Sequence, residues 1–147
     1  MKKSHILLIV IFILVITGWV IVKNNSYPEQ ICIEKTCFNV EIADTDEEKI
    51  IGLGNRDFLV ENSGMLFVFE EKGTYGFWMK DMRFPIDVIW INPEMKISGI
   101  VKDFQPCESN EPCPVVYPDE DIAYVLEINS GMAKKNSFEE RDYVYFR

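Results

Sequence analysis

An uncharged apolar segment near the N-terminus most limits what this chain can fold into. Residues 6–22 read ILLIVIFILVITGWVIV and contain no Asp, Glu, Lys or Arg. A helix of that length extends about 25 Å, close to the thickness of the hydrocarbon layer of a bilayer. The chain is therefore expected to divide into a membrane segment and a separate body.

The main alternative for this segment is a cleaved signal peptide. A cleavage site of small residues is typical of such peptides, but here the segment runs directly into Lys23. We therefore favour an uncleaved signal anchor over residues 1–23, a polar tether over residues 24–30 and a single β-rich domain over residues 31–147.

The charges that flank the segment predict its orientation. Lys2 and Lys3 precede it and favour a cytoplasmic N-terminus. We expect a single-pass protein of the cytoplasmic membrane, bound to the bilayer through this helix, with its C-terminal domain outside the cytoplasm.

The body is strongly acidic. The whole chain has a net charge of −9, and only two of its 15 basic residues precede the apolar segment, so the remainder carries 13 bases against 24 acids, a net charge of −11. An acidic surface repels phosphate backbones, so nucleic acid is excluded as the main partner.

Four cysteines form two pairs that are close in sequence, Cys32 with Cys37 and Cys107 with Cys113. Outside the cytoplasm an even number of cysteines indicates disulfide bonds, and we favour local pairing among the three possible connectivities. The alternative is a zinc site with four cysteine ligands. Neither pair has the two-residue spacing of common zinc sites, and no histidine is near, so disulfides are preferred.

The body is rich in predicted strands. Runs dense in Val, Ile, Phe, Tyr and Trp, separated by Gly, Pro or Asn, predict strands over residues 38–43, 65–69, 75–80, 86–91, 96–104, 122–129 and 142–146. Long helices do not alternate with them, so a parallel doubly wound sheet is not expected. We predict a mainly β fold: a compact antiparallel domain, barrel-like or sandwich-like.

One short helix is expected early in the body. Thr45 is followed three residues later by Glu48, the spacing of a capping box, and Ile50, Ile51 and Leu53 form a short apolar stripe. Gly52 and Gly54 should end this helix early.

Catalysis that depends on histidine is excluded from the body. His5 is the only histidine, and it adjoins the apolar segment. Triads of Ser-His-Asp type and histidine-rich metal sites are therefore absent, and no metal or other cofactor is predicted. Acid–base chemistry would need carboxylates, lysine or tyrosine.

Two acids interrupt otherwise apolar strands, Asp87 and Glu127. Buried charges are costly unless they are paired, so a shared polar site with Lys80 and Arg56 is one interpretation. The simpler interpretation, which the pattern alone favours, is that both acids face solvent or form structural ion pairs. A candidate groove, formed by Trp78, Met79 and Tyr124, is expected beside the irregular stretch over residues 105–121.

Several blocks together resemble a known family, the prokaryotic proteins called domain of unknown function 192. The resemblance covers residues 38–146 and rests on residues 48–53, 64–69, 77–80, 85–89 and 124–131. Gly-Met-Leu-Phe, then Phe-Trp-Met-Lys, then Pro-Ile-Asp is its most specific part. It implies a compact β-rich fold, often preceded by a signal or anchor, and no activity. Where the family usually has glycine before the last strand, this chain has Arg141, which tolerates positive φ poorly.

Three functions are compatible with these features. The first is a membrane-tethered, non-catalytic module of the cell envelope that binds an unknown small molecule or serves another envelope protein. The second is a hydrolase that acts on an envelope glycan with Asp87 and Glu127 as a carboxylate pair, which requires both in one cleft. The third is a structural or assembly protein, for which an exposed apolar patch is expected.

Overall fold

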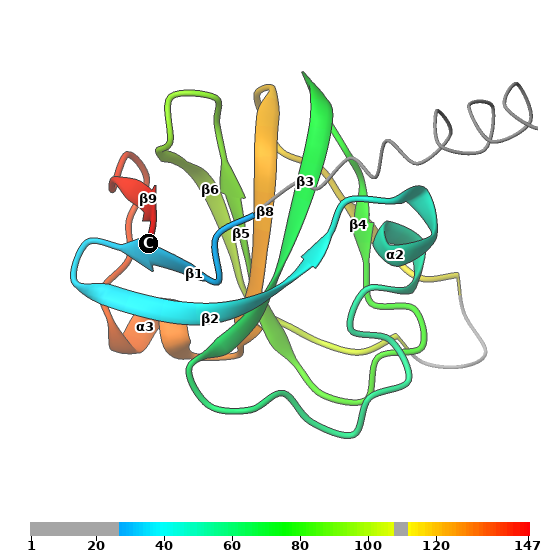
Figure 1. Ribbon diagram of the computed structural model, residues 1–147. Coiled ribbons are helices and arrows are strands. Elements are labelled where there is room, and N and C mark those ends of the chain that lie inside the picture. The colour runs from blue at the N-terminus through cyan, green and yellow to red at the C-terminus, as the bar shows by residue number, and fades with distance from the viewer. Residues whose placement is uncertain (1–26, 108–111) are drawn as a thin grey trace, which may run out of the picture.

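The computed structural model describes residues 27–107 and 112–147, which form a mainly β structure (Figure 1). The expected anchor and the first three residues of the expected tether, 24–26, lie outside the described residues, so the boundaries predicted for them stay predictions. Within the described residues, no helix is long and apolar enough to cross a bilayer.

Seven strands form the main sheet, in the order β6-β5-β8-β3-β2-β1-β9. A separate two-stranded sheet pairs β4 with β7. The elements are β1 (Gln30–Ile33), β2 (Thr36–Ala43), α2 (Asp46–Ile51), β3 (Ser63–Gly73), β4 (Phe77–Trp78), β5 (Ile86–Ile91), β6 (Ile97–Phe104), β7 (Val115–Val116), β8 (Ile122–Asn129), α3 (Met132–Lys135) and β9 (Val144–Phe146).

The main sheet curls until its two edges touch, as the barrel-like interpretation predicts (Figure 1). A bridge joins Lys96, just before β6, to Tyr143, just before β9. The Val144 amide also donates to the Met95 carbonyl at 2.9 Å. The sheet is not purely antiparallel, because β2 and β3 run parallel. Residues 44–62, which contain α2, provide the crossover that a parallel pair requires.

The expected strands are all present, although β4 is shorter than predicted. Sequence reasoning missed β1, β7 and α3, because four-residue or shorter elements carry too little periodicity. The early helix is confirmed as α2. The Thr45 hydroxyl accepts from the Glu48 amide, and the Glu48 carboxylate accepts from the Thr45 amide, which completes the capping box. Gly52, at φ 51°, ends the helix as predicted.

Alternating residues of the sheet pack into two separate cores. One face contributes Ile89 and Leu126 to a core that also includes Phe138 and Val144. The other face contributes Met65, Phe67, Val88 and Val125 to a core that includes Leu53, Phe77 and Met79. The first core lies inside the curl of the sheet, and the second lies between the sheet and the segments that carry α2 and β4.

Both expected disulfide bonds are present. Cys32 and Cys37 face each other across the β1–β2 hairpin, and Cys107 is joined to Cys113 just before β7. The second bond restrains the segment that pairs with β4. No cysteine remains free among the described residues, so these cysteines supply no thiolate nucleophile.

Arg141 occupies the left-handed conformation that the family resemblance called into question. Its φ is 75°, and its amide donates to the Ile97 carbonyl at 2.8 Å. A side chain other than glycine at such an angle costs about 1 kcal/mol. The turn before β9 is therefore retained at a local cost, and the hydrogen bond to β6 helps to hold it.

Candidate functional site

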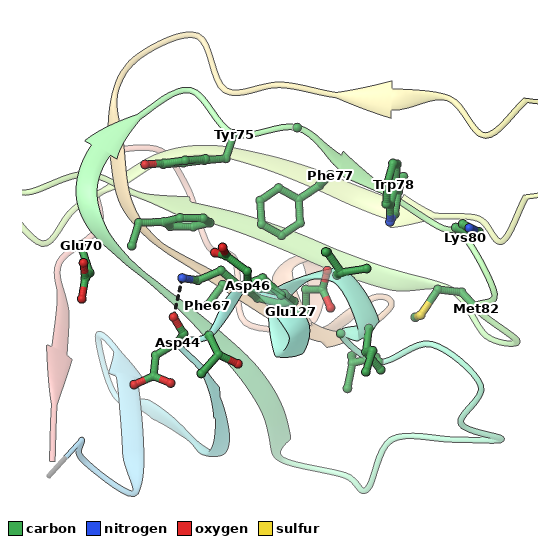
Figure 2. A pocket seen from close by; sticks show the side chains of 18 of the residues that line it. Asp44, Asp46, Phe67, Glu70, Tyr75, Phe77, Trp78, Lys80, Met82 and Glu127 are labelled. Carbon is green, nitrogen blue, oxygen red and sulfur yellow. Dashed lines mark hydrogen bonds between the residues drawn. The ribbon is translucent and has the colours of Figure 1, made fainter. Parts of the chain in front are cut away.

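A cleft of about 830 Å³ opens between the main sheet, α2 and β4 (Figure 2). Side chains from β3, from the segment around α2 and from residues 75–82 line it, and one residue of β8, Glu127, contributes from the sheet. The cleft exists because α2 and β4 both pack over the same face of the curled sheet. It has the size of a small-molecule site.

One wall of the cleft is aromatic. It consists of Phe67, Phe69, Tyr75, Phe77 and Trp78. The rings of Phe69 and Tyr75 are stacked with centroids 3.8 Å apart, and Phe77 meets Phe67 edge-to-face at 5.1 Å. Trp78 is 45% exposed although it is one of the largest apolar side chains. These contacts give a wall that is largely formed before any ligand arrives.

Glu127 is the buried acid of this cleft. Its side chain comes from β8, is 5% exposed and lines the cleft together with the aromatic residues (Figure 2). None of the described residues forms a hydrogen bond or ion pair with its carboxyl group. Burial raises the pKa of Glu127 to about 8, because a charged carboxylate is poorly solvated there. The carboxyl group is therefore mostly protonated at neutral pH.

Charged residues surround the mouth of the cleft, four of them acidic and two basic: Asp44, Asp46, Glu70, Glu71, Lys49 and Lys80. The Lys49 ammonium donates to the Asp44 carbonyl at 2.6 Å and lies 5.2 Å from the centre of the Phe69 ring. The aromatic wall thus already contacts one ammonium group of the protein itself.

Asp87 lies outside this cleft, on the opposite face of the sheet. In the β5–β8 pair Asp87 is opposite Ile128, whereas Glu127 is opposite Val88. Directly opposed residues share a face and successive residues alternate, so the two acids point to different sides. The carboxylate-pair hydrolase requires both groups in one cleft, and the structure does not meet this requirement.

The carboxylate of Asp87 has a structural role instead. It is fully buried, and its two oxygens each accept a backbone hydrogen bond of 2.8 Å, from the amides of Asp103 and Ala133. These bonds tie the end of β6 and the first turn of α3 to β5. Neither predicted interpretation of Asp87, a shared site or a solvent-facing acid, describes this arrangement.

Three further predicted residues are not in the cleft. Arg56 forms a double hydrogen bond with Glu41, at 2.6 and 2.8 Å, on the surface. Met79 is 1% exposed and belongs to the core beneath the cleft. Tyr124 lies on the other face of the sheet, against Phe146. Of the predicted polar site and groove, only Lys80, Trp78 and Glu127 come together.

Apart from Trp78, the aromatic wall is the part of the site that sequence reasoning missed. Residues of this stretch, such as Phe67 and Phe77, are typical of a core, and both are indeed at most 8% exposed. The only signal was the alternation after Phe77, which puts Trp78, Lys80 and Met82 on one side; all three line the cleft. No group of three or more potential metal ligands gathers among the described residues.

Comparison with known proteins gives a family and a fold. The family model DUF192, described as an uncharacterized ACR, matches residues 29–146. A protein of unknown function from Novosphingobium aromaticivorans DSM 12444 is 25% identical with a TM-score of 0.74, and the match covers 80% of this chain and 84% of that one. A protein suggested to be a transcription regulator, from Sinorhizobium meliloti 1021, is 26% identical with a TM-score of 0.72, covering 80% and 90%. No curated protein matches the sequence.

Proposed function

The chain belongs to the DUF192 family, and from the geometry of its cleft we propose that it is a non-catalytic module that binds a small ligand. The observation that carries this proposal is Glu127, a buried carboxyl group without a partner among the described residues, at an aromatic-walled opening of ligand size. An unpaired buried acid costs folding free energy. Such groups concentrate at functional sites, where a ligand supplies the missing partner.

A binding role fits the cleft better than catalysis. Hydrolysis of a glycan by the usual mechanism needs two carboxyl groups about 5–10 Å apart across the scissile bond. Among the described residues, Glu127 has no second buried acid on its face, because Asp87 faces the other way. The acids at the mouth, such as Asp46 and Glu71, are exposed and belong to the rim.

The proposed location is the outer side of the cytoplasmic membrane. Two disulfide bonds support an oxidising compartment. The uncharged segment over residues 6–22 supports a tether to the bilayer. The regulator role suggested for the Sinorhizobium protein is not carried over, because a net charge of −11 beyond this segment opposes binding to DNA.

Fragment binding tests the proposed function. The full-length protein, labelled with ¹⁵N, is titrated with a panel of small aromatic fragments, neutral, cationic and anionic, and amide shifts are recorded. We expect shifts to cluster at the cleft, around Phe69 and Trp78. Trp78→Ala should weaken binding about tenfold, since an aromatic contact contributes about 1 kcal/mol or more. If no fragment shifts these amides, the proposed function is wrong.

Phe58→Ala is the matched control for Trp78→Ala. Phe58 is an aromatic residue that is 71% exposed and does not line the cleft. Its substitution should leave fragment affinity unchanged, and a loss of affinity in this variant would show that the Trp78 effect is not specific to the cleft.

Protease accessibility tests the proposed location. Spheroplasts that express the full-length chain are treated with protease before and after lysis, and non-reducing electrophoresis follows the disulfide bonds. Digestion in intact spheroplasts, with both bonds oxidised, is expected. Protection of the chain from protease until lysis would contradict the proposed orientation but would leave the binding proposal unaffected.

The assembly role is kept as a second candidate because of one observation. Phe58 and Val60 are 71% and 61% exposed and lie two residues apart on the segment before β3. Crosslinking from this segment in native membranes, with Phe58→Ala as the comparison, would recover a partner if the segment is a contact surface. Failure to capture any protein would remove this second candidate function.

A further inference from the structure

We propose that the cleft binds an organic ammonium ion, whose cationic head pairs with Glu127 and whose apolar part lies against the aromatic wall. This inference rests on the proposed function, that the cleft binds a small ligand, and names the chemical class of that ligand. Three independent features of the cleft carry it: the rings, the charges at the mouth and the unpartnered carboxyl group.

The aromatic wall favours a cation. Ring faces carry partial negative charge and attract ammonium groups within about 6 Å of their centres. Lys49 already makes such a contact, 5.2 Å from the centre of the Phe69 ring. The rings of Phe77 and Trp78, further along the same wall, line the cleft nearer to Lys80 and Met82 (Figure 2).

The charges at the mouth also favour a cation over an anion. Four acids and two lysines line it, which gives a net charge of −2 before Glu127 is counted. One of the lysines, Lys49, already donates to the Asp44 carbonyl. A carboxylate or phosphate ligand would have to approach past an excess of negative charge, whereas an ammonium ion is attracted.

The carboxyl group of Glu127 completes the argument. It is 5% exposed and forms no hydrogen bond with the described residues, so its two oxygens are available to accept bonds from an ammonium group. A protonated carboxyl group must lose its proton before it can form an ion pair. Since its pKa is about 8, an ammonium ligand should release about one proton on binding at neutral pH.

The proton release separates this proposal from binding by apolar contact alone. The charged groups that line the cleft around Glu127 are Asp44, Asp46 and Lys49 from the α2 segment, Glu70 and Glu71 from β3, and Lys80 after β4. Each of them is more exposed to solvent than Glu127, which is the only buried acid of the set. Removal of Glu127 alone should therefore remove the pH dependence.

Calorimetric titration of the full-length protein provides the test. The probes are benzylammonium, which stays protonated over the pH range used, and benzyl alcohol as its neutral isostere. We expect benzylammonium to bind about 50-fold more tightly at pH 8 than at pH 6, as linkage to a group with a pKa of about 8 requires. Two buffers with different heats of ionisation should report the released proton at pH 7, and benzyl alcohol should release none.

Glu127→Gln and Glu47→Gln are the matched variants. Glu47 lies on α2 but does not line the cleft, so its substitution should change neither affinity nor proton release. Glu127→Gln should lose the pH dependence for benzylammonium and release no proton when it binds. Equal, pH-independent binding of both probes by the parent protein would overturn the ammonium proposal and leave the binding function standing. Binding of neither probe at the cleft would instead remove the proposed function itself.

Discussion

Two buried acids on neighbouring strands of this protein have opposite environments. Asp87 on β5 accepts two backbone hydrogen bonds of 2.8 Å. Glu127 on β8 accepts none from the described residues and lines the cleft. In the β5–β8 register Glu127 is opposite Val88, one residue beyond Asp87, and this offset directs the two side chains to opposite faces of the sheet.

The difference separates structural burial from burial that can serve function. Asp87 compensates for its loss of water with backbone donors from β6 and α3, so its burial holds three elements together. No group among the described residues compensates Glu127 for its loss of water, and its raised pKa reflects the free energy that burial of its charged form would cost. An acid of the first kind is explained by the fold alone, whereas an acid of the second kind is not, and it is the basis of the proposed ligand site.

The pH dependence of stability should give the largest effect. The carboxyl group of Glu127 titrates near 4.5 when unfolded and near 8 when folded, so between these values the folded state binds more protons. The contribution of this group to the free energy of unfolding is fully present below pH 4.5 and is lost as the pH rises through 8. The free energy of unfolding is predicted to fall by about 4–5 kcal/mol over this range. Urea unfolding of the parent and Glu127→Gln from pH 5 to pH 9 measures it.

Glu127→Gln should show almost none of this dependence. It should unfold like the parent at pH 5 and should be more stable than the parent at pH 9, because a glutamine never acquires the buried charge. Parallel pH profiles for the two proteins would mean that the carboxyl group of Glu127 is solvated in the folded state, and the contrast with Asp87 would disappear.

Asp87→Asn should destabilise the protein by about 2–3 kcal/mol at pH 7. The amide keeps one acceptor oxygen but turns a donor group towards a backbone N–H, so one of the two hydrogen bonds is lost and one donor is left unsatisfied. Denaturant unfolding measures the change, and Asp119→Asn, at an exposed acid, is the control. A loss below about 0.5 kcal/mol would show that Asp87 is not a structural anchor.

Replacing Cys107 and Cys113 by serine should lower the stability of the protein, and beyond that global effect it should disturb only the side of the sheet that carries the cleft. The bond closes a short loop beside β7, so its removal should cost about 2 kcal/mol. Because β7 pairs with β4, where Trp78 lies, fragment affinity should fall as well. The amides of Asp103 and Ala133 donate to Asp87 on the other face, so their hydrogen exchange should become faster only as much as the loss of global stability requires. Selective loss of protection there would show that the two faces are coupled.

Most of the strands and the helix α2 could be predicted from sequence because they depend on local pattern. Runs dense in Val, Ile and aromatic residues predicted strands such as β2 and β8, and Thr45 with Glu48 predicted the start of α2. The roles of Asp87 and Glu127 could not be separated in this way. Both interrupt apolar strands, and only the register of β5 against β8, set by contacts 40 residues apart in sequence, assigns them to different faces.

The same limit explains why the cleft was only partly foreseen. Trp78 and Lys80 were predicted from residue type alone, Trp78 as part of a groove and Lys80 as a basic partner for the two acids. The other residues of the cleft come from α2, such as Lys49, and from β3, such as Phe69. The crossover that contains α2, together with the parallel pairing of β2 with β3, brings them to the cleft. No local pattern predicts that crossover, because parallel pairing depends on contacts between distant segments.

Arg56→Met should have the smallest effect and the opposite dependence on pH. The Arg56–Glu41 pair is on the surface, with side chains 34% and 58% exposed, so solvent screening limits its contribution to about 0.5 kcal/mol. The hydrogen bond from Arg56 lowers the pKa of Glu41, so this contribution is present above the unfolded pKa of 4.5 and is lost as the pH falls below it. Unfolding of Arg56→Met and the parent at pH 3 and pH 7 should show the difference only at pH 7. A difference that was present at pH 3 and lost by pH 7 would follow the pattern of Glu127, and an exposed, paired acid could then no longer be distinguished from a buried, unpaired one by its titration.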